Sequence, residues 1–229
     1  MENIIEKKFV LEYIKDYLNT VSLSSTKEIE NARYYHNTSY CNVASIITNG
    51  ILSLEELNKF KIRDDSESFL KTMSDIDSHI NGVDSISLSV VGLTNLYKDE
   101  FEYDPFCKNS VGFVITSDIK AYRTASHYGN EFLAKGIISN DKFRAIDIRL
   151  LKLIEQLEKD YNINSYLYVS YEDVITRFNE LRGIAKAIIK SNLDVPFREM
   201  SYDNRELDIA KLANAPKLVL EPKSIKKVC

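Results

Sequence analysis

The sequence predicts an α+β protein in which a mixed β-sheet with flanking helices comes first and a mainly helical portion follows. Short runs rich in aromatic and β-branched residues recur between residues 32 and 148, and such runs favour strands. Apolar residues at helical spacing dominate the chain after residue 149. The 229 residues include only 7 glycines and 4 prolines, too few for long linkers or low-complexity segments. We therefore expect a single domain over residues 1–229.

The first 50 residues predict a helix, a strand and a second helix. Apolar residues from Ile4 to Leu18 recur at helical spacing between Glu and Lys residues, which indicates an amphipathic helix followed by a polar joint, together residues 1–31. Residues 32–38 favour a strand, on which alternation places three side chains on one face, those of Tyr34, His36 and Thr38. The following helix is expected to stop at Gly50.

The rest of the chain predicts four more strands and then two helices. The charged and polar stretch from residue 54 to residue 80 indicates a mobile helical or loop excursion. Alternating or continuously apolar runs predict strands at residues 85–89, 111–115, 131–134 and 145–148. Helix-spaced apolar residues predict helices at 150–158 and 174–189. The sheet core is thus expected to cover residues 32–148, and a helical C-terminal extension residues 149–229.

Composition and missing motifs exclude several functional classes. With 30 Lys and Arg against 34 Asp and Glu, the net charge of −4 gives no global basic field for nucleic acid. The three cysteines are far apart, which argues against a disulfide framework or a zinc site, so we expect no metal. Glycine-rich phosphate loops, dinucleotide fingerprints and His-Glu-x-x-His are absent. No apolar run approaches the roughly 18 residues that span a bilayer, so we expect a cytoplasmic protein without a membrane partner.

Polar residues at strand ends are the candidates for chemistry. His36 precedes a helix, where an imidazole and nearby backbone amides can receive a ribose hydroxyl or a phosphate; the alternative is a structural histidine. Glu131 opens an apolar run and either projects into a pocket or lies on an exposed edge. Ser87 and Ser89 either bind a ligand or form a solvated strand face. No local signature supports a nucleophilic pair of Cys41 or Cys107 with His36, His79 or His127.

Two short motifs resemble the ADP-ribosyltransferase superfamily. Tyr35-His36-Asn37-Thr38, with the helix that ends at Asn49-Gly50-Ile51-Leu52, is similar to the superfamily's opening His-x-Thr-like strand and helix. The run from Asn130 to Gly136 and the strand at 145–148 are similar to its catalytic-glutamate strand and the strand after it. The Glu-Phe-Leu run at 131–133 is especially similar to DarT-like toxins, which ADP-ribosylate DNA bases. The resemblance covers roughly residues 32–148 and implies a split mixed β-sheet core.

The resemblance implies an NAD-dependent mono-ADP-ribosyltransferase, with NAD as a substrate. Transfer of ADP-ribose breaks the nicotinamide–ribose bond through an oxocarbenium-like state, which a nearby carboxylate stabilises. By resemblance, Glu131 is the catalytic residue that binds the nicotinamide-ribose hydroxyl and orients or deprotonates the acceptor. The residues expected to bind NAD, the last three of them from position alone, are His36, Asn37, Thr38, Ser87, Tyr122 and Tyr128. Two residues, Arg63 and Arg123, are candidates for the arginine of DarT-like proteins.

Two classes of acceptor are compatible with the sequence. The DarT-like resemblance points to a base in single-stranded nucleic acid, and the helical stretch with Arg182, Lys186 and Lys190 offers a local basic patch together with the lysine-rich tail. The net negative charge argues for a protein acceptor instead. A bacterial or phage toxin or defence role is implied, with an antitoxin or inhibitor as a partner. The competing interpretations are a module that binds NAD or ADP-ribose without transfer, an NAD hydrolase, and a protein-interaction module.

Overall fold

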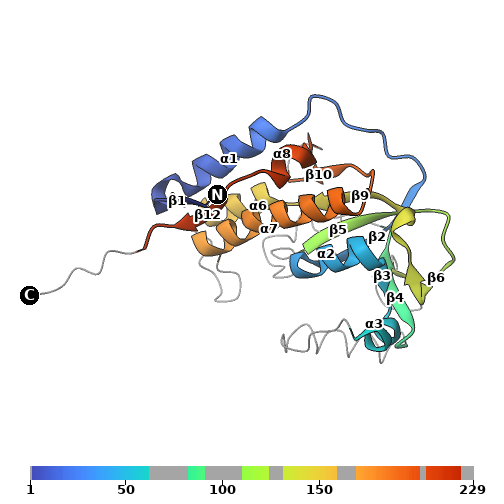
Figure 1. The fold of residues 1–229 in the computed structure, drawn as a ribbon. Coiled ribbons are helices and arrows are strands. Elements are labelled where there is room, and N and C mark those ends of the chain that lie inside the picture. The colour runs from blue at the N-terminus through green and yellow to red at the C-terminus, as the bar shows by residue number, and fades with distance from the viewer. Residues whose placement is uncertain are drawn as a thin grey trace, which may run out of the picture.

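The chain forms a mixed α/β fold with six α-helices among the residues described (Figure 1). The computed structural model describes residues 2–61, 82–90, 110–123, 131–158, 169–201 and 205–222. The helices are α1 (Val10–Val21), α2 (Tyr40–Asn49), α3 (Leu54–Phe60), α6 (Leu150–Glu158), α7 (Tyr171–Lys190) and α8 (Ile209–Ala213), with 3₁₀ turns η1 (Lys7–Phe9) and η3 (Asn140–Lys142). The strands are β1 (Glu2–Ile5), β2 (Ala32–Ser39), β3 (Ile51–Leu52), β4 (Ser85–Ser89), β5 (Ser110–Thr116), β6 (Ala121–Arg123), β7 (Glu131–Lys135), β8 (Ile137–Ile138), β9 (Phe143–Ile148), β10 (Phe197–Glu199), β11 (Arg205–Glu206) and β12 (Lys217–Leu220).

Eight of these strands form one sheet, in the order β11-β10-β9-β5-β2-β4-β7-β6. Its neighbours are antiparallel except for β9 and β10, which are parallel. Two smaller sheets accompany it: β3 pairs antiparallel with β8, and β1 pairs parallel with β12. The last pair joins the N-terminal strand to a strand that lies after residue 216.

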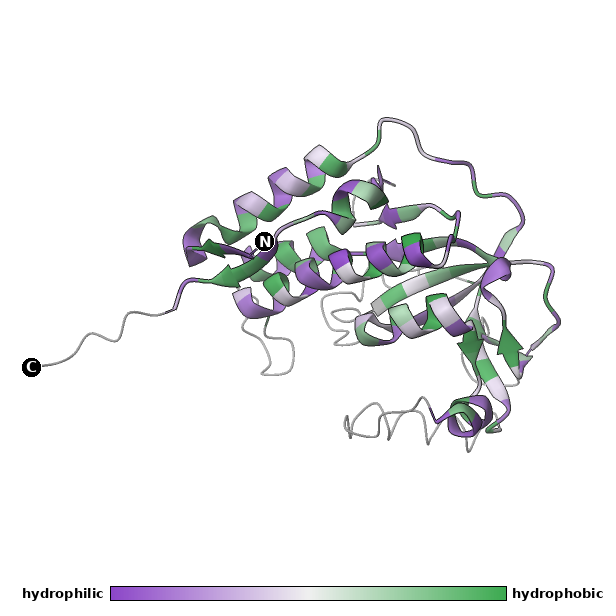
Figure 2. Ribbon diagram, in the orientation of Figure 1, coloured by the Kyte–Doolittle hydropathy of each residue, from purple (hydrophilic) through white to green (hydrophobic). Residues whose placement is uncertain are grey.

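One face of the main sheet packs against the helices, and the opposite face carries polar residues. Phe113, Ile146 and Phe197 lie in one cross-strand row on β5, β9 and β10, and each is fully buried in the core that also contains the apolar side of α7. The neighbouring row, which points to the opposite face, contains Asp147 and Arg198. Figure 2 shows apolar colours along β5 and β9 and mixed colours along the exposed helices.

Gly50 ends α2 in a backbone conformation that other residues rarely adopt. Its φ of 80° and ψ of 179° lie in a region restricted largely to glycine, and a Cβ there would lie 2.5 Å from the carbonyl oxygen of Ile138. We expect Gly50→Ala to lower the free energy of unfolding by roughly 2–3 kcal/mol, as measured by urea denaturation.

Gly136→Ala is the matched control for this prediction. Gly136 also has a positive φ, of 72°, but nothing in the described structure lies within 4 Å of a Cβ built there. Gly136→Ala should therefore lower the free energy of unfolding by the backbone strain alone, about 1 kcal/mol. Equal losses in the two variants would contradict the close approach of Gly50 to β8.

Most predicted elements are confirmed with small shifts at their ends, but the two termini differ from the prediction. Ile4 and Ile5 belong to β1 rather than to the predicted helix, because pairing with β12 overrides their helical spacing. The segment after residue 149 contains the predicted helices and also β10, β11 and β12; β10 and β11 extend the main sheet. The predicted excursion at 54–80 begins with α3, and its remainder lies outside the described residues.

Candidate active site

The main sheet is divided where β2 meets β4. In the described part of the chain, these two strands share a single paired position, Tyr35 opposite Ser89. Five strands continue on the β2 side and three on the β4 side (Figure 1). The other edge of β2 makes a long ladder with β5. Beyond the Tyr35–Ser89 pair, no further β2–β4 position is paired among the described residues, and the Ser87 carbonyl is bonded by the His36 side chain instead of by the backbone of β2.

Glu131 lies in one cross-strand row with this junction. Ser89 is opposite Tyr35 on one side and opposite Glu131 on the other. Directly opposed residues point to the same face of a sheet, so the three side chains share a face. Two strand spacings, about 10 Å, separate the Cα atoms of Tyr35 and Glu131. A ligand of dinucleotide size can reach from β2 to the carboxylate.

His36 connects β2 to β4 through its side chain. Its Nδ1 lies 3.0 Å from the backbone carbonyl oxygen of Ser87. Because a carbonyl oxygen only accepts, Nδ1 carries the proton and Nε2 of the neutral ring is left as an acceptor. Burial lowers the pKa of His36, against the opposing effect of this hydrogen bond. The ring is thus neutral and held in one orientation, so its Nε2 can accept a hydrogen bond from a hydroxyl group.

The neutral state of His36 predicts a pH dependence of stability. The unfolded chain takes up the proton near the ordinary pKa of 6.5, whereas the folded protein resists it because its pKa is lowered. The free energy of unfolding should therefore be highest above pH 6.5 and fall as the pH drops through that value.

Denaturation of the wild type and His36→Asn over a pH series tests this expectation. The Asn amide can still donate near the Ser87 carbonyl but does not titrate, so the decline below pH 6.5 should be smaller in the variant. Superimposable pH profiles would show that His36 is not held neutral by the fold.

The two residues after His36 present different polar groups. The side-chain oxygen Oδ1 of Asn37 is buried, and no described group donates to it. An unpaired buried acceptor is costly, and an amide or hydroxyl of a ligand would satisfy it. Thr38 accepts a hydrogen bond from Nδ2 of Asn42 at 3.1 Å, which leaves the Thr38 hydroxyl proton for another acceptor.

The structure brings together part of the predicted set. Ser87 lies opposite Leu133, which in turn lies opposite Tyr122 on β6, so both share a face with Glu131. Tyr122 is 47% exposed at the outer strand of this half. His36 and Thr38 point to the other face of β2, and only the imidazole reaches β4. Arg123 is opposite Phe132 and points away from the Glu131 face.

Several predicted residues lie outside the described part of the chain. These are Tyr128, Arg63, Cys107, His79 and His127. Cys41 is exposed at the start of α2, where its sulfur contacts the Ser39 hydroxyl at 3.2 Å. Within the described ranges, no three His, Cys, Asp or Glu side chains are placed to hold a metal ion. No helix in those ranges is both long and apolar enough to cross a membrane.

Tyr35 and the Asp147–Arg198 ion pair were not identified from the sequence as parts of the site. Arg198 donates to both carboxylate oxygens of Asp147, at 2.7 and 2.8 Å, and the carboxylate is nearly fully buried. Burial raises the pKa of Asp147, while Arg198 opposes the shift. Burial also raises the pKa of Tyr35, and the Asp147 charge adds to this. Gly112 on β5 lies opposite Asn37 on one side and opposite Asp147 on the other. Asp147 and Asn37 therefore share a face of the sheet, which only the strand register reveals.

Comparisons with known proteins add no assignment. No protein-family model matches the sequence, and no curated protein or solved structure is significantly similar to it.

Proposed function

We propose that this protein is an NAD-dependent mono-ADP-ribosyltransferase that binds NAD at the split between β2 and β4. The single paired position between these strands supports the proposal, because His36 bonds across the split to Ser87 from one face of the sheet and Glu131 lies in the Tyr35–Ser89 row on the other face. The two motifs that resemble the superfamily are far apart in the sequence, and they lie on β2 and β7, the two strands that flank β4. The resemblance implies a split mixed β-sheet, and the short pairing between β2 and β4 supports that comparison.

Each polar group at the split has a role in the proposed reaction. The unprotonated Nε2 of His36 accepts a hydrogen bond from a ribose hydroxyl of NAD, and Oδ1 of Asn37 accepts from a second donor of the substrate. The Glu131 carboxylate stabilises the positive charge that develops on the nicotinamide ribose as its bond to nicotinamide breaks. The acceptor's nucleophilic atom then bonds to the ribose carbon and releases its proton to the carboxylate or to solvent.

A nucleic-acid acceptor is slightly favoured over a protein acceptor. Lys186 and Lys190 are exposed on consecutive turns of α7, with Arg182 partly buried one turn before them. Nε of Arg182 has no hydrogen-bond partner among the described groups. Three cations on one helix face form a local positive strip despite the net charge of −4. A toxin or defence role, with an antitoxin or inhibitor that restrains the enzyme, follows from the DarT-like resemblance.

Incubation of the purified protein with labelled NAD and separate pools of DNA, RNA and lysate protein tests the proposal. Transfer of label to one pool, lost in Glu131→Ala, is the expected result and identifies the acceptor class. Release of free nicotinamide without labelled macromolecule would replace transfer by hydrolysis. Binding of NAD without any nicotinamide release would leave a binding module, and the absence of NAD binding would overturn the proposal.

A further inference from the structure

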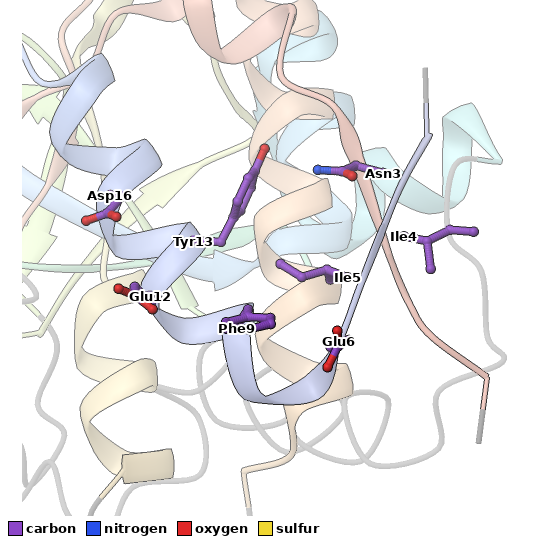
Figure 3. Close-up of a pocket in the computed structure, with 8 residues that line it drawn as sticks. All are labelled: Asn3, Ile4, Ile5, Glu6, Phe9, Glu12, Tyr13 and Asp16. Atoms are coloured by element: carbon purple, nitrogen blue, oxygen red, sulfur yellow. The ribbon is translucent and has the colours of Figure 1, made fainter. Parts of the chain in front are cut away.

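An open groove lies on a different part of the molecule, between β1 and α1 (Figure 3). Its volume is about 420 Å³, and its walls come from the first 16 residues of the chain. None of the wall residues belongs to the strands that carry His36, Ser89 or Glu131. The groove is therefore separate from the proposed NAD site.

The outer edge of β1 borders this groove with backbone groups that the β1–β12 ladder does not use. The amide of Glu221 donates to the carbonyl oxygen of Ile5, at 3.0 Å. In a parallel ladder, alternate residues direct their N–H and C=O groups to the same neighbour, so Ile5 and Asn3 bond toward β12 and Ile4 faces outward. In the described structure β12 is the sole strand partner of β1. An open edge of this kind can accept another strand.

Apolar side chains lie beside that open edge. Ile4 is 68% exposed and Phe9 is 47% exposed, both high values for large apolar residues. In Figure 2, the β1–β12 pair at the margin of the molecule has green apolar segments beside purple polar ones. Lys8 lies 4.6 Å above the Phe9 ring and 3.0 Å from Glu6, so this surface already holds one ammonium between an aromatic ring and a carboxylate.

The helix side of the groove is acidic. Glu12 and Asp16 lie one turn apart on α1, are exposed, and form no ion pair within the described residues. Like charges one turn apart disfavour each other, and a cation placed between them removes that cost. The groove thus combines an open strand edge, exposed apolar side chains and uncompensated negative charge.

We propose that this groove binds an extended segment of a partner protein in which lysine or arginine alternates with apolar residues. The segment adds as a strand to the outer edge of β1, bonds to the backbone of Ile4, and directs its cations toward Glu12 and Asp16. Its apolar side chains lie on the other face of the added strand, where they cover the exposed Ile4. A second copy of this chain fits less well, because antiparallel pairing of β1 with itself about Ile4 places Glu2 opposite Glu6.

The probe is a fluorescently labelled, end-capped peptide, Lys-Ile-Lys-Ile-Lys-Ile, whose affinity for the full chain is measured by anisotropy. The control peptide replaces each Lys by Glu and is expected not to bind. Glu12→Gln/Asp16→Asn should weaken binding of the basic peptide by about fivefold, an effect that salt reduces. The matched double variant Glu28→Gln/Glu30→Gln removes two exposed charges elsewhere and should leave affinity unchanged.

Two substitutions at Ile4 separate strand addition from simple charge attraction. Ile4→Pro removes the outward N–H and should weaken binding more than Ile4→Ser, which keeps that donor. If thermal unfolding shows that the Pro variant does not fold, the affinities of the Ser and double-charge variants for the basic peptide test the proposal. Equal affinity for both peptides, or no loss in the double-charge variant, would overturn the proposal.

Sedimentation of the free protein supplies one further outcome. Dimerisation that Ile4→Lys abolishes would make a second copy the occupant, against the proposal. No readout in this experiment involves NAD, so its failure leaves the proposed enzymatic function untouched.

Discussion

Glu131→Gln is expected to lower the turnover number for ADP-ribosyl transfer by roughly a thousandfold while NAD affinity stays within about threefold of wild type. The substitution keeps the size of the side chain and removes its charge. The carboxylate is needed only when positive charge develops on the ribose. Its loss therefore raises the activation free energy of transfer and leaves the dissociation constant for NAD nearly unchanged. Single-turnover rates of nicotinamide release, with NAD affinity measured separately, give the two quantities.

The matched control for Glu131→Gln is Asp84→Asn. Asp84 precedes β4 and pairs with Lys135 at 2.7 Å, at the end of the β4–β7 ladder that is far from the split. It should therefore retain near-wild-type turnover. Wild-type rates in Glu131→Gln would remove Glu131 from the mechanism, and equal losses in the two variants would indicate a general effect on the β4–β7 pair.

Arg198→Met is expected to lower the free energy of unfolding by about 3–5 kcal/mol. Asp147 is 2% exposed, and its carboxylate would lose both hydrogen bonds from the guanidinium. Burial already raises the pKa of Asp147, so the carboxyl would be left either charged without a partner or protonated in a site built for a charge. Urea denaturation at neutral pH measures the loss.

Two further variants test whether the unpaired charge causes this loss. Asp147→Leu/Arg198→Met removes both partners and should recover most of the stability, since neither charge is then left buried. Lys27→Met breaks an exposed ion pair with Asp194 and should cost less than about 1 kcal/mol. A double variant as unstable as Arg198→Met would show that packing, rather than the orphaned carboxylate, dominates.

The sequence predicted the elements with strong local patterns and missed those that depend on distant partners. The alternation of residues 85–89 and the apolar run of β5 are properties of the segments themselves, and both strands form as expected. Ile4 and Ile5 are compatible with a helix until Leu218 to Leu220 pair beside them. β10 and β11 contain three and two residues, too few for a periodic signal.

The candidate site could be predicted in its members but not in its arrangement. His36 and Glu131 were identified from residue type and local wording, whereas Ser89 rather than Ser87 is the residue opposite Glu131. That distinction depends on the register of β4 against β7, because a slip of two residues would place Ser87 opposite Glu131. Tyr35 could be placed in the row with Glu131 only once the pairing of β2 with β4 was known.

NAD binding at the split can be observed most directly at His36. The sequence contains only 3 histidines, so histidine-selective isotope labelling gives a simple NMR spectrum, and the His36→Asn spectrum assigns the signal. We expect a neutral ring protonated at Nδ1 whose Nε2 resonance shifts on addition of NAD and reaches saturation. A His36 signal that is unchanged by NAD, while the protein binds NAD or releases nicotinamide, would place the NAD site away from the split between β2 and β4.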